Sequence, residues 1–409
     1  MTNLAETTQR PTSVFWRYWS ATTTSQVGSA VTTVALPLAA LVLLEASAFE
    51  VGLLVAAGDL GWLILTLPAG ALATHLPLRG LQAGVDFVRA VALLVPAVLW
   101  ALDLLTMTAL FGVALTVSFA NVFAFVANTT YIPQVVPKGQ LNSRNSLMSG
   151  THAVTQLGGP PIAGVAVQLL GAPLALLADA ASYLVSGALM WTLPRAERPR
   201  VTRAPLVQQI REGWAYVLRH PLMRPMMIDA TATNFAAGML LTLTPIYLVR
   251  ELGASPATYG IVLASEGLGA LIGASVGPRL GRMLGTGRLL LTAAVLSVPS
   301  VLLMPLGEGG VGMLTFALGN ALFAFFTVIL SVITRTYRQQ ESPPELLARV
   351  MATVRFVSWS VIPIGGFMAG WIANATSARA TLWLIAIAVA VSPVVLVASP
   401  LRRQREVLT

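Results

Sequence analysis

The sequence predicts an all-α membrane protein of twelve transmembrane helices in two pseudo-symmetric six-helix halves, and three observations support this prediction. Hydrophobic residues make up 56% of the 409 residues and charged residues only 10%, with a mean hydropathy of +0.77. Soluble domains carry about 25% charged residues. Apolar segments long enough to cross about 30 Å of hydrocarbon recur along the chain. Related segments also lie about half a chain length apart.

The apolar segments of about 20 residues or more are separated by short polar stretches. They lie near residues 17–44, 50–73, 80–102, 106–132, 142–170, 172–193, 222–249, 257–283, 288–306, 310–334, 346–374 and 379–400. This spacing divides the chain into a tail (1–16), a six-helix half (17–193), a linker (194–221), a second six-helix half (222–400) and a basic tail (401–409).

Two stretches, residues 141–164 and 347–370, show the same pattern of a basic start and a glycine-rich apolar end. The corresponding positions, 205 or 206 residues apart, are Arg144 with Arg349 and Gly164 with Gly370. A second set, 208 residues apart, is Gly52 with Gly260, Leu60 with Leu268, Gly61 with Gly269 and Ile64 with Ile272. Two homologous halves joined by a linker are typical of secondary transporters, which bind their substrate between the halves.

Basic residues are distributed unequally between the two sides of the predicted membrane. The loops after the odd-numbered spans contain only Arg250 and Arg379, and the other 23 of the 25 Lys and Arg residues lie toward the opposite side. The positive-inside rule therefore places both termini and the linker in the cytoplasm and the chain in the cell (plasma or inner) membrane. This distribution explains the net charge of +9, so we expect a lipid bilayer as partner and no nucleic acid. In the linker, Leu206, Ile210 and Trp214 recur at helical spacing, which predicts an amphipathic helix on the inner membrane surface.

No pattern in the sequence indicates an enzyme, a cofactor or a metal site. The histidines His75, His152 and His220 are far apart, the chain has no cysteine, and no HExxH, P-loop or GxSxG context occurs. Without a nucleotide-binding domain, transport would draw on an ion gradient, which supplies about 2.3 kcal/mol per charge per 100 mV.

Acidic residues inside the spans are the candidates for binding protons or substrate. An ionised side chain at mid-membrane costs at least about 2.5–3.5 kcal/mol, so it needs a partner, a cavity or a proton. Asp59 in span two and Glu266 in span eight lie one position from exact repeat correspondence, and Asp229 lies in span seven. These three acids are the candidates for proton coupling or substrate contact, and a hydrogen bond between helices is the alternative that stays open for each. Asp179 in span six is expected to anchor helices.

Polar residues inside the spans predict a wet cavity between the halves. The candidates for its lining are Gln26, Ser29, Asn128, His152, Gln156, Asn234 and Asn320. Trp62 and Trp359 could contact the apolar part of an amphipathic substrate.

Short motifs are spread over nearly the whole chain. They are Ser-Gln-Val-Gly-Ser at 25–29, Asp86 with Arg89-Ala90, Pro-Gln-Val-Val-Pro at 133–137, Asp-Ala-Ala-Ser-Tyr at 179–183 and residues 347–356 entering span eleven. Together they resemble the major facilitator superfamily, and within it the bacterial exporter branch with the enterobactin exporter, macrolide efflux pumps and transmembrane secretion effectors. The resemblance implies a fold that works by alternating access, usually as a monomer.

Gly159, Pro160 and Gly164 in span five are similar to a signature of exporters that exchange a substrate for protons. The signature ends in two glycines, whereas this chain has Ala163 before Gly164. In such exporters this segment packs helix five closely against a partner helix and seals one side of the cavity.

The resemblance also assigns an inner gate. The family's loop after span two reads Gly-x-x-x-Asp-Arg, and here Gly70 is followed by Thr74 and His75 in place of Asp and Arg. In the family that Asp helps to hold the cytoplasmic gate shut through its charge, and here Thr74 can offer only a hydrogen bond. The other gate candidates are Arg79, the one-turn pair Asp86 and Arg89, and the repeat-related pair Arg144 and Arg349. Span four lacks the membrane arginine that many proton-coupled exporters use.

These residues and the resemblance predict a secondary transporter that exports a small amphipathic compound from the cytoplasm in exchange for protons. A drug, an antibiotic or a siderophore-like metabolite would fit this description. Two alternatives stay open: a proton-coupled importer on the same fold, and a membrane sensor or structural protein that does not transport.

Overall fold

The computed structural model describes residues 12–73, 78–136, 140–194 and 206–408, which form helices joined by short turns. Eleven helical stretches in these ranges are long and apolar enough to cross a membrane. A shorter apolar helix of 17 residues is the twelfth span; at 1.5 Å per residue it is about 26 Å long, close to the thickness of a thin bilayer core. The predicted fold class is therefore confirmed. Gly70 lies in the second helix, while Thr74 and His75 lie outside the described residues.

The first half of the chain contains six membrane helices. They are α1 (Thr12–Leu38), α2 (Ala48–Ala73), α3 (Leu78–Ala101), α4 (Met107–Val135), α5 (Leu141–Leu170) and α6 (Ala172–Trp191). Helix α1 continues into a π-helical turn at Ala39–Leu43, directly after Pro37.

The second half repeats this arrangement. Its helices are α8 (Met223–Pro245), α9 (Pro256–Leu284), α10 (Thr286–Leu302), α11 (Gly309–Glu341), α12 (Pro344–Trp359), α13 (Val361–Ala375) and α14 (Ala378–Ala398). Helix α8 also runs into a π-helical turn, Ile246–Glu251, after Pro245. Pro37 and Pro245 are 208 residues apart, the same offset as the repeated glycines, so the duplication includes this turn.

Helices α12 and α13 form a single span that is interrupted at Ser360. Pro363 explains the position of the break. A proline lacks the backbone N–H that would bond the carbonyl four residues earlier, here that of Trp359, and its ring clashes with that carbonyl. The related helix α5 stays unbroken through Pro160 and Pro161.

The helix α7 (Leu206–Arg219) lies between the two halves in the chain and packs against the end of the second half. A Cβ atom at Gly213 would lie 2.7 Å from the carbonyl oxygen of Arg349 on α12, so the two helices touch through their backbones. Arg349 also forms an ion pair with Glu212 of α7. In the helix, Val217 is buried, whereas Trp214 is exposed.

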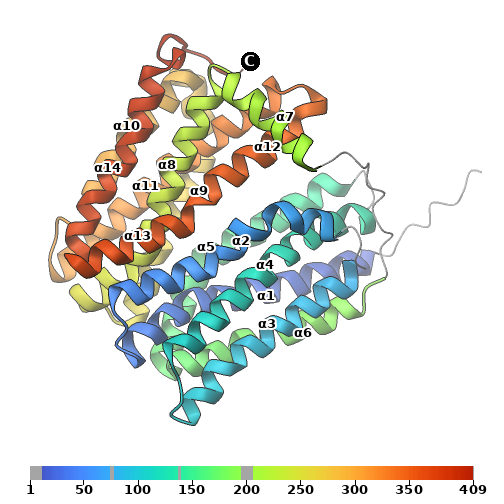
Figure 1. Ribbon diagram of the computed structural model, residues 1–409, viewed down its shortest axis with the longest axis vertical. Coiled ribbons are helices and arrows are strands. Elements are labelled where there is room, and N and C mark those ends of the chain that lie inside the picture. Colours follow the sequence, from blue (N-terminus) through green and yellow to red (C-terminus); the bar gives the residue numbers. More distant parts are fainter. Residues whose placement is uncertain (1–11, 74–77, 137–139, 195–205, 409) are drawn as a thin grey trace, which may run out of the picture.

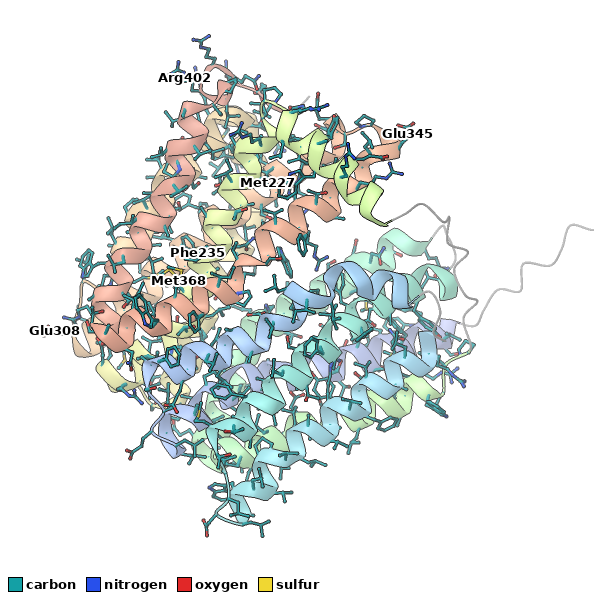
Figure 2. The ribbon with its side chains drawn as sticks, viewed as in Figure 1. Met227, Phe235, Glu308, Glu345, Met368 and Arg402 are labelled. Atoms are coloured by element: carbon teal, nitrogen blue, oxygen red, sulfur yellow. The ribbon has the colours of Figure 1, made fainter. Side chains whose placement is uncertain are left out.

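The two halves meet at one end and diverge at the other. Figure 1 shows α1–α6 and α8–α14 as two layers that converge on the side away from α7 and separate toward α7. We call these the closed end and the open end. Figure 2 places Glu345 and Arg402 at the α7 end of the second half, and Glu308 at its opposite end.

Four glycines bring the halves together at the closed end. A Cβ atom on Gly52 of α2 would lie 2.7 Å from the Cα atom of Gly370 on α13. In the same way, a Cβ atom on Gly260 of α9 would lie 3.1 Å from the Cα atom of Gly164 on α5. Small residues allow such backbone contact between membrane helices. The repeat-related glycines thus pair crosswise, one from each half in each contact.

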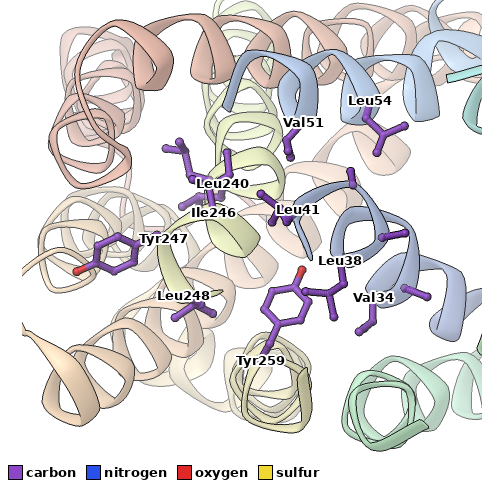
Figure 3. Close-up of a cluster of buried hydrophobic side chains, with 14 of the residues drawn as sticks. Val34, Leu38, Leu41, Val51, Leu54, Leu240, Ile246, Tyr247, Leu248 and Tyr259 are labelled. Atoms are coloured by element: carbon purple, nitrogen blue, oxygen red, sulfur yellow. The ribbon is translucent and has the colours of Figure 1, made fainter. Parts of the chain in front are cut away.

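A large apolar cluster fills the space beside these contacts. It combines Leu38 and Leu41 of the first half with Leu240, Leu248 and Tyr259 of the second (Figure 3). Across the same junction the Nη2 atom of Arg250 donates a hydrogen bond of 2.6 Å to the carbonyl oxygen of Ala46. The closed end is therefore tightly packed from both halves.

We expect Gly52→Ala to destabilise this structure by about 1–3 kcal/mol, because the added methyl meets backbone atoms that cannot move aside. The measurement is the thermal unfolding midpoint of the purified protein. Gly112→Ala in α4 is the matched control, since a Cβ atom there meets no atom within 4 Å among the described residues. Equal midpoints for the two variants would contradict the close contact at Gly52.

Candidate functional site

A cavity of about 1240 Å³ lies between the two halves. Its wall comes from α1, α2, α4 and α6 of the first half and from α8, α9, α11 and α12 of the second. At the closed end it reaches Leu54 and Tyr259 of the apolar cluster, and toward the open end it reaches Arg338 near the end of α11. Drug-sized ligands bind in cavities of roughly 300–1,000 Å³, so this one has room for such a molecule.

Two of the predicted acids, Asp59 and Glu266, lie on the cavity wall. Asp59 is half-buried and Glu266 is exposed, and neither forms a hydrogen bond or an ion pair with a described residue. They stand on α2 and α9, which are repeat-related helices on opposite halves. An acid that packs against no partner in a membrane protein has to be met by water, a proton or a ligand.

Asp229 also lies on the wall, but its surroundings are different. It is 2% exposed and accepts a hydrogen bond from Ser392 of α14. It is close enough to Arg338 for the two charges to attract each other. Asp229 is therefore a fixed part of the second half that reaches the cavity.

Asp179 lies in a network inside the first half. It accepts hydrogen bonds from Thr32 of α1 and, at 2.9 Å, from Ser182. Nearby, Ser29 and the Tyr183 hydroxyl are 2.8 Å apart and both line the cavity. This arrangement ties α1 to α6 at the back of the wall.

Asp86 and Arg89 form an ion pair of 3.0 Å within α3. Asp86 also accepts a hydrogen bond of 2.7 Å from Ser186 of α6, and the Arg89 guanidinium lies 5.1 Å from the ring centre of Tyr183. These partners all belong to the first half, so in this conformation the pair links α3 to α6.

The predicted polar lining divides into two groups. Ser29, Asn234 and Asn320 lie on the cavity wall. Gln26, Asn128, His152 and Gln156 lie outside it. Asn128 accepts hydrogen bonds from Tyr18, at 2.8 Å, and from Gln82, both within the first half. On α5, His152 and Gln156 are exposed.

The remaining gate candidates contact residues of their own half or of α7. Arg79 donates a hydrogen bond of 3.0 Å to the carbonyl oxygen of Leu193, and the Arg144 guanidinium lies 4.5 Å from the ring centre of Phe15. Arg349 pairs with Glu212. These three arginines thus leave the open end unlatched in this conformation.

Gly159, Pro160 and Gly164 lie where α5 packs against its neighbours. A Cβ atom on Gly159 would be 2.5 Å from the Cβ atom of Ala30 on α1. On Gly164 it would be 2.3 Å from the carbonyl oxygen of Pro256 on α9. The glycines permit this helix to touch both halves at once.

Sequence reasoning missed an arginine cluster in the wall. Arg335 and Arg338 belong to the 23 basic residues that predict membrane orientation alone, and Arg355 is not among the site candidates predicted from the sequence. All three line the cavity. The Arg355 guanidinium lies 4.2 Å from the ring centre of Phe125 and 4.4 Å from that of Trp359. For Arg355 the signal is a basic side chain inside the predicted span 346–374, because such a residue needs a partner as much as an acid does.

Comparison with known proteins gives a consistent result. A model of the family described as transmembrane secretion effector matches residues 7–408. The multidrug efflux pump Tap of Mycolicibacterium fortuitum is 25% identical over 93% of this chain and 94% of its own. The MFS-type transporter YvqJ of Bacillus subtilis is 25% identical over 61% of this chain. The matched part spans 60% of the length of that relative.

Two solved structures share the fold. The nucleoside transporter NupG superposes with a TM-score of 0.77 at 12% identity, over 94% of this chain and 98% of its own. A bacterial homologue of the iron transporter ferroportin, in its inward-facing state, gives a TM-score of 0.75 at 16% identity, over 94% and 98%.

We expect Asp59→Ala to change thermal stability little, because Asp59 forms no hydrogen bond or ion pair with a described residue. Asp179→Ala is the matched comparison, since it leaves the hydroxyls of Thr32 and Ser182 without their acceptor, at a cost of about 1–3 kcal/mol. Both unfolding midpoints are measured in the same lipid nanodiscs. If Asp59→Ala destabilised the protein as much as Asp179→Ala, Asp59 would have a structural role.

Proposed function

Because the chain belongs to the transmembrane secretion effector family of the major facilitator superfamily, we propose that it exports a small amphipathic organic compound from the cytoplasm in exchange for protons. The observation on which this proposal rests is the pair Asp59 and Glu266. They are repeat-related acids that form no hydrogen bond or ion pair with a described residue, on opposite halves of one cavity. The similarity to the multidrug efflux pump Tap favours the outward direction.

The distribution of basic residues supports an orientation with the open end in the cytoplasm. Arg219, Arg282 and Arg402 are exposed at the end where α7 packs, whereas the loops of the closed end contain Arg250 and Arg379 as their basic residues. The positive-inside rule places the richer side in the cytoplasm. In that orientation the structure is inward-facing, ready to take a substrate from the cytoplasm.

The acids would act as follows in alternating access. In the inward-facing state Asp59 and Glu266 release protons to the cytoplasm, and the substrate then binds in the cavity. The halves rock so that the open end closes and the closed end separates. Protons from the outside neutralise the acids as the substrate leaves, and the neutral cavity returns at lower cost, because an uncompensated charge is expensive inside the membrane.

The test uses inverted membrane vesicles energised by respiration, in which proton leakage is followed by fluorescence while candidate compounds are added. Macrolides, siderophores, dyes and other hydrophobic drugs form the panel. We expect at least one compound to dissipate the proton gradient with the wild-type protein, and Asp59→Asn or Glu266→Gln to abolish this response.

Glu345→Gln is the control, since Glu345 is exposed at the open end and lies outside the cavity. It removes one acid and should leave the response intact. If a compound accumulates only in right-side-out vesicles, the protein is an importer. If compounds bind but neither they nor protons move, the transport proposal fails.

A further inference from the structure

The cavity wall holds three arginines, Arg335, Arg338 and Arg355, all from α11 and α12 of the second half. The charge of Arg335 acts on both of the others, so the three form one cluster. Like charges repel strongly in a low-dielectric environment, so such a cluster is stable only with an anion or abundant water near it.

Two of these side chains have hydrogen-bond donors that no described residue accepts. Arg338 is only 8% exposed, and its buried Nε and Nη1 atoms have no partner. The buried Nε atom of Arg355 also has no partner. Buried polar groups in folded proteins are almost always satisfied, so these N–H groups are available to a ligand in the cavity.

The position of Arg355 leaves the edge of its guanidinium available. Phe125 and Trp359 lie 4.2 and 4.4 Å from it, and Trp62 lies 5.5 Å away. Rings at such distances bind the flat face of a guanidinium. The N–H donors point outward in the plane of the group, in a fork that matches a carboxylate, sulfonate or phosphate.

The acids of the cavity do not neutralise the cluster. The charge of Asp229 attracts Arg338, but the hydrogen bond that Asp229 accepts comes from Ser392. None of the three arginines forms an ion pair with a described residue. Asp59 lies deeper than Arg338, because 14 residues separate it from the open end of α2 at Ala73, about 21 Å at 1.5 Å per residue. Arg338 is three residues from the end of α11 at Glu341, or about 5 Å.

Membrane orientation alone does not account for this arrangement. The positive-inside rule needs basic residues near the membrane surface and is satisfied by exposed ones such as Arg282 and Arg402. It does not need an arginine that is only 8% exposed, such as Arg338, or a guanidinium held among three aromatic rings, as in Arg355.

We propose that the compound bound in this cavity is an organic anion with a flat apolar body. Its carboxylate, sulfonate or phosphate group binds the free donors of Arg338 and Arg355, and its body contacts Trp62, Phe125 and Trp359. This inference rests on the proposed function for its account of transport, since it names the substrate class of the same cavity. It leaves Asp59 and Glu266 beyond the bound anion, free to exchange protons.

The experiment measures binding by equilibrium dialysis to the full chain in nanodiscs of neutral lipid, with empty nanodiscs as background. The probes are three carboxylates of increasing size, benzoate, 2-naphthoate and 1-pyrenebutyrate, each compared with its own amide. We expect at least one carboxylate to bind ten-fold or more tightly than its amide. Arg338→Gln and Arg355→Gln should each reduce that ratio to near one.

Arg402→Gln is the matched control, since it removes one exposed arginine outside the cavity and should keep the ratio. Arg355→Lys provides a second variant if a glutamine variant unfolds: it keeps the charge but loses the fork, and should lower the ratio. A ratio near one for all three pairs in the wild type, or a ratio insensitive to all cavity arginines, overturns the inference.

The inference and the proposed function can fail separately. If the carboxylates bind through the arginines but are not transported with protons, the anion site stands and the export proposal fails. If neutral or cationic compounds are exported while no carboxylate is preferred over its amide, the export proposal stands and the anion site fails.

Discussion

The backbone contact between the two halves at four glycines is the constraint on which the rest of the structure depends. Gly52 with Gly370, and Gly164 with Gly260, bring α2 against α13 and α5 against α9 at the closed end. Gly52 corresponds to Gly260 in the repeat, and Gly164 corresponds to Gly370. The two glycine contacts are therefore related to each other by the pseudo-two-fold symmetry of the duplication. With the halves held at one end and separated at the other, the space between them becomes the cavity.

The chemistry of that cavity is divided along its depth. Arg335 and Arg338 lie in the last two turns of α11 at the open end, and Arg355, with the aromatic rings around it, lies farther in on α12. Farther in are Asp59 and Glu266, without partners among the described residues. If one organic anion left as one proton entered, two charges would move in the favourable direction, and the membrane potential would contribute about 4.6 kcal/mol per 100 mV. The proposed substrate and the proposed coupling therefore reinforce each other.

The fold could be predicted from the sequence because composition and duplication are properties of many residues at once. The role of a single residue was harder to predict, because it depends on which neighbours the fold brings to it. Asp59 and Glu266 were found because an acid inside a membrane needs a cavity or a partner. Asn128 was selected by the same reasoning, yet Tyr18 and Gln82 satisfy it within one half, and no sequence pattern distinguishes the two cases. The contacts of Gly52 with Gly370 and of Gly164 with Gly260 could not be predicted either. A sequence repeat shows which positions correspond in the two halves, but it does not show which residues touch.

The most direct test of alternating access about the glycine contacts measures distances at both ends of the molecule. The chain has no cysteine, so spin labels can be attached to introduced pairs, Ser143→Cys with Gln339→Cys at the open end and Thr106→Cys with Val311→Cys at the closed end. The account predicts that changing pH or adding a transported compound shortens the first distance while lengthening the second. Distances that change in the same direction, or that stay fixed under every condition, would contradict it.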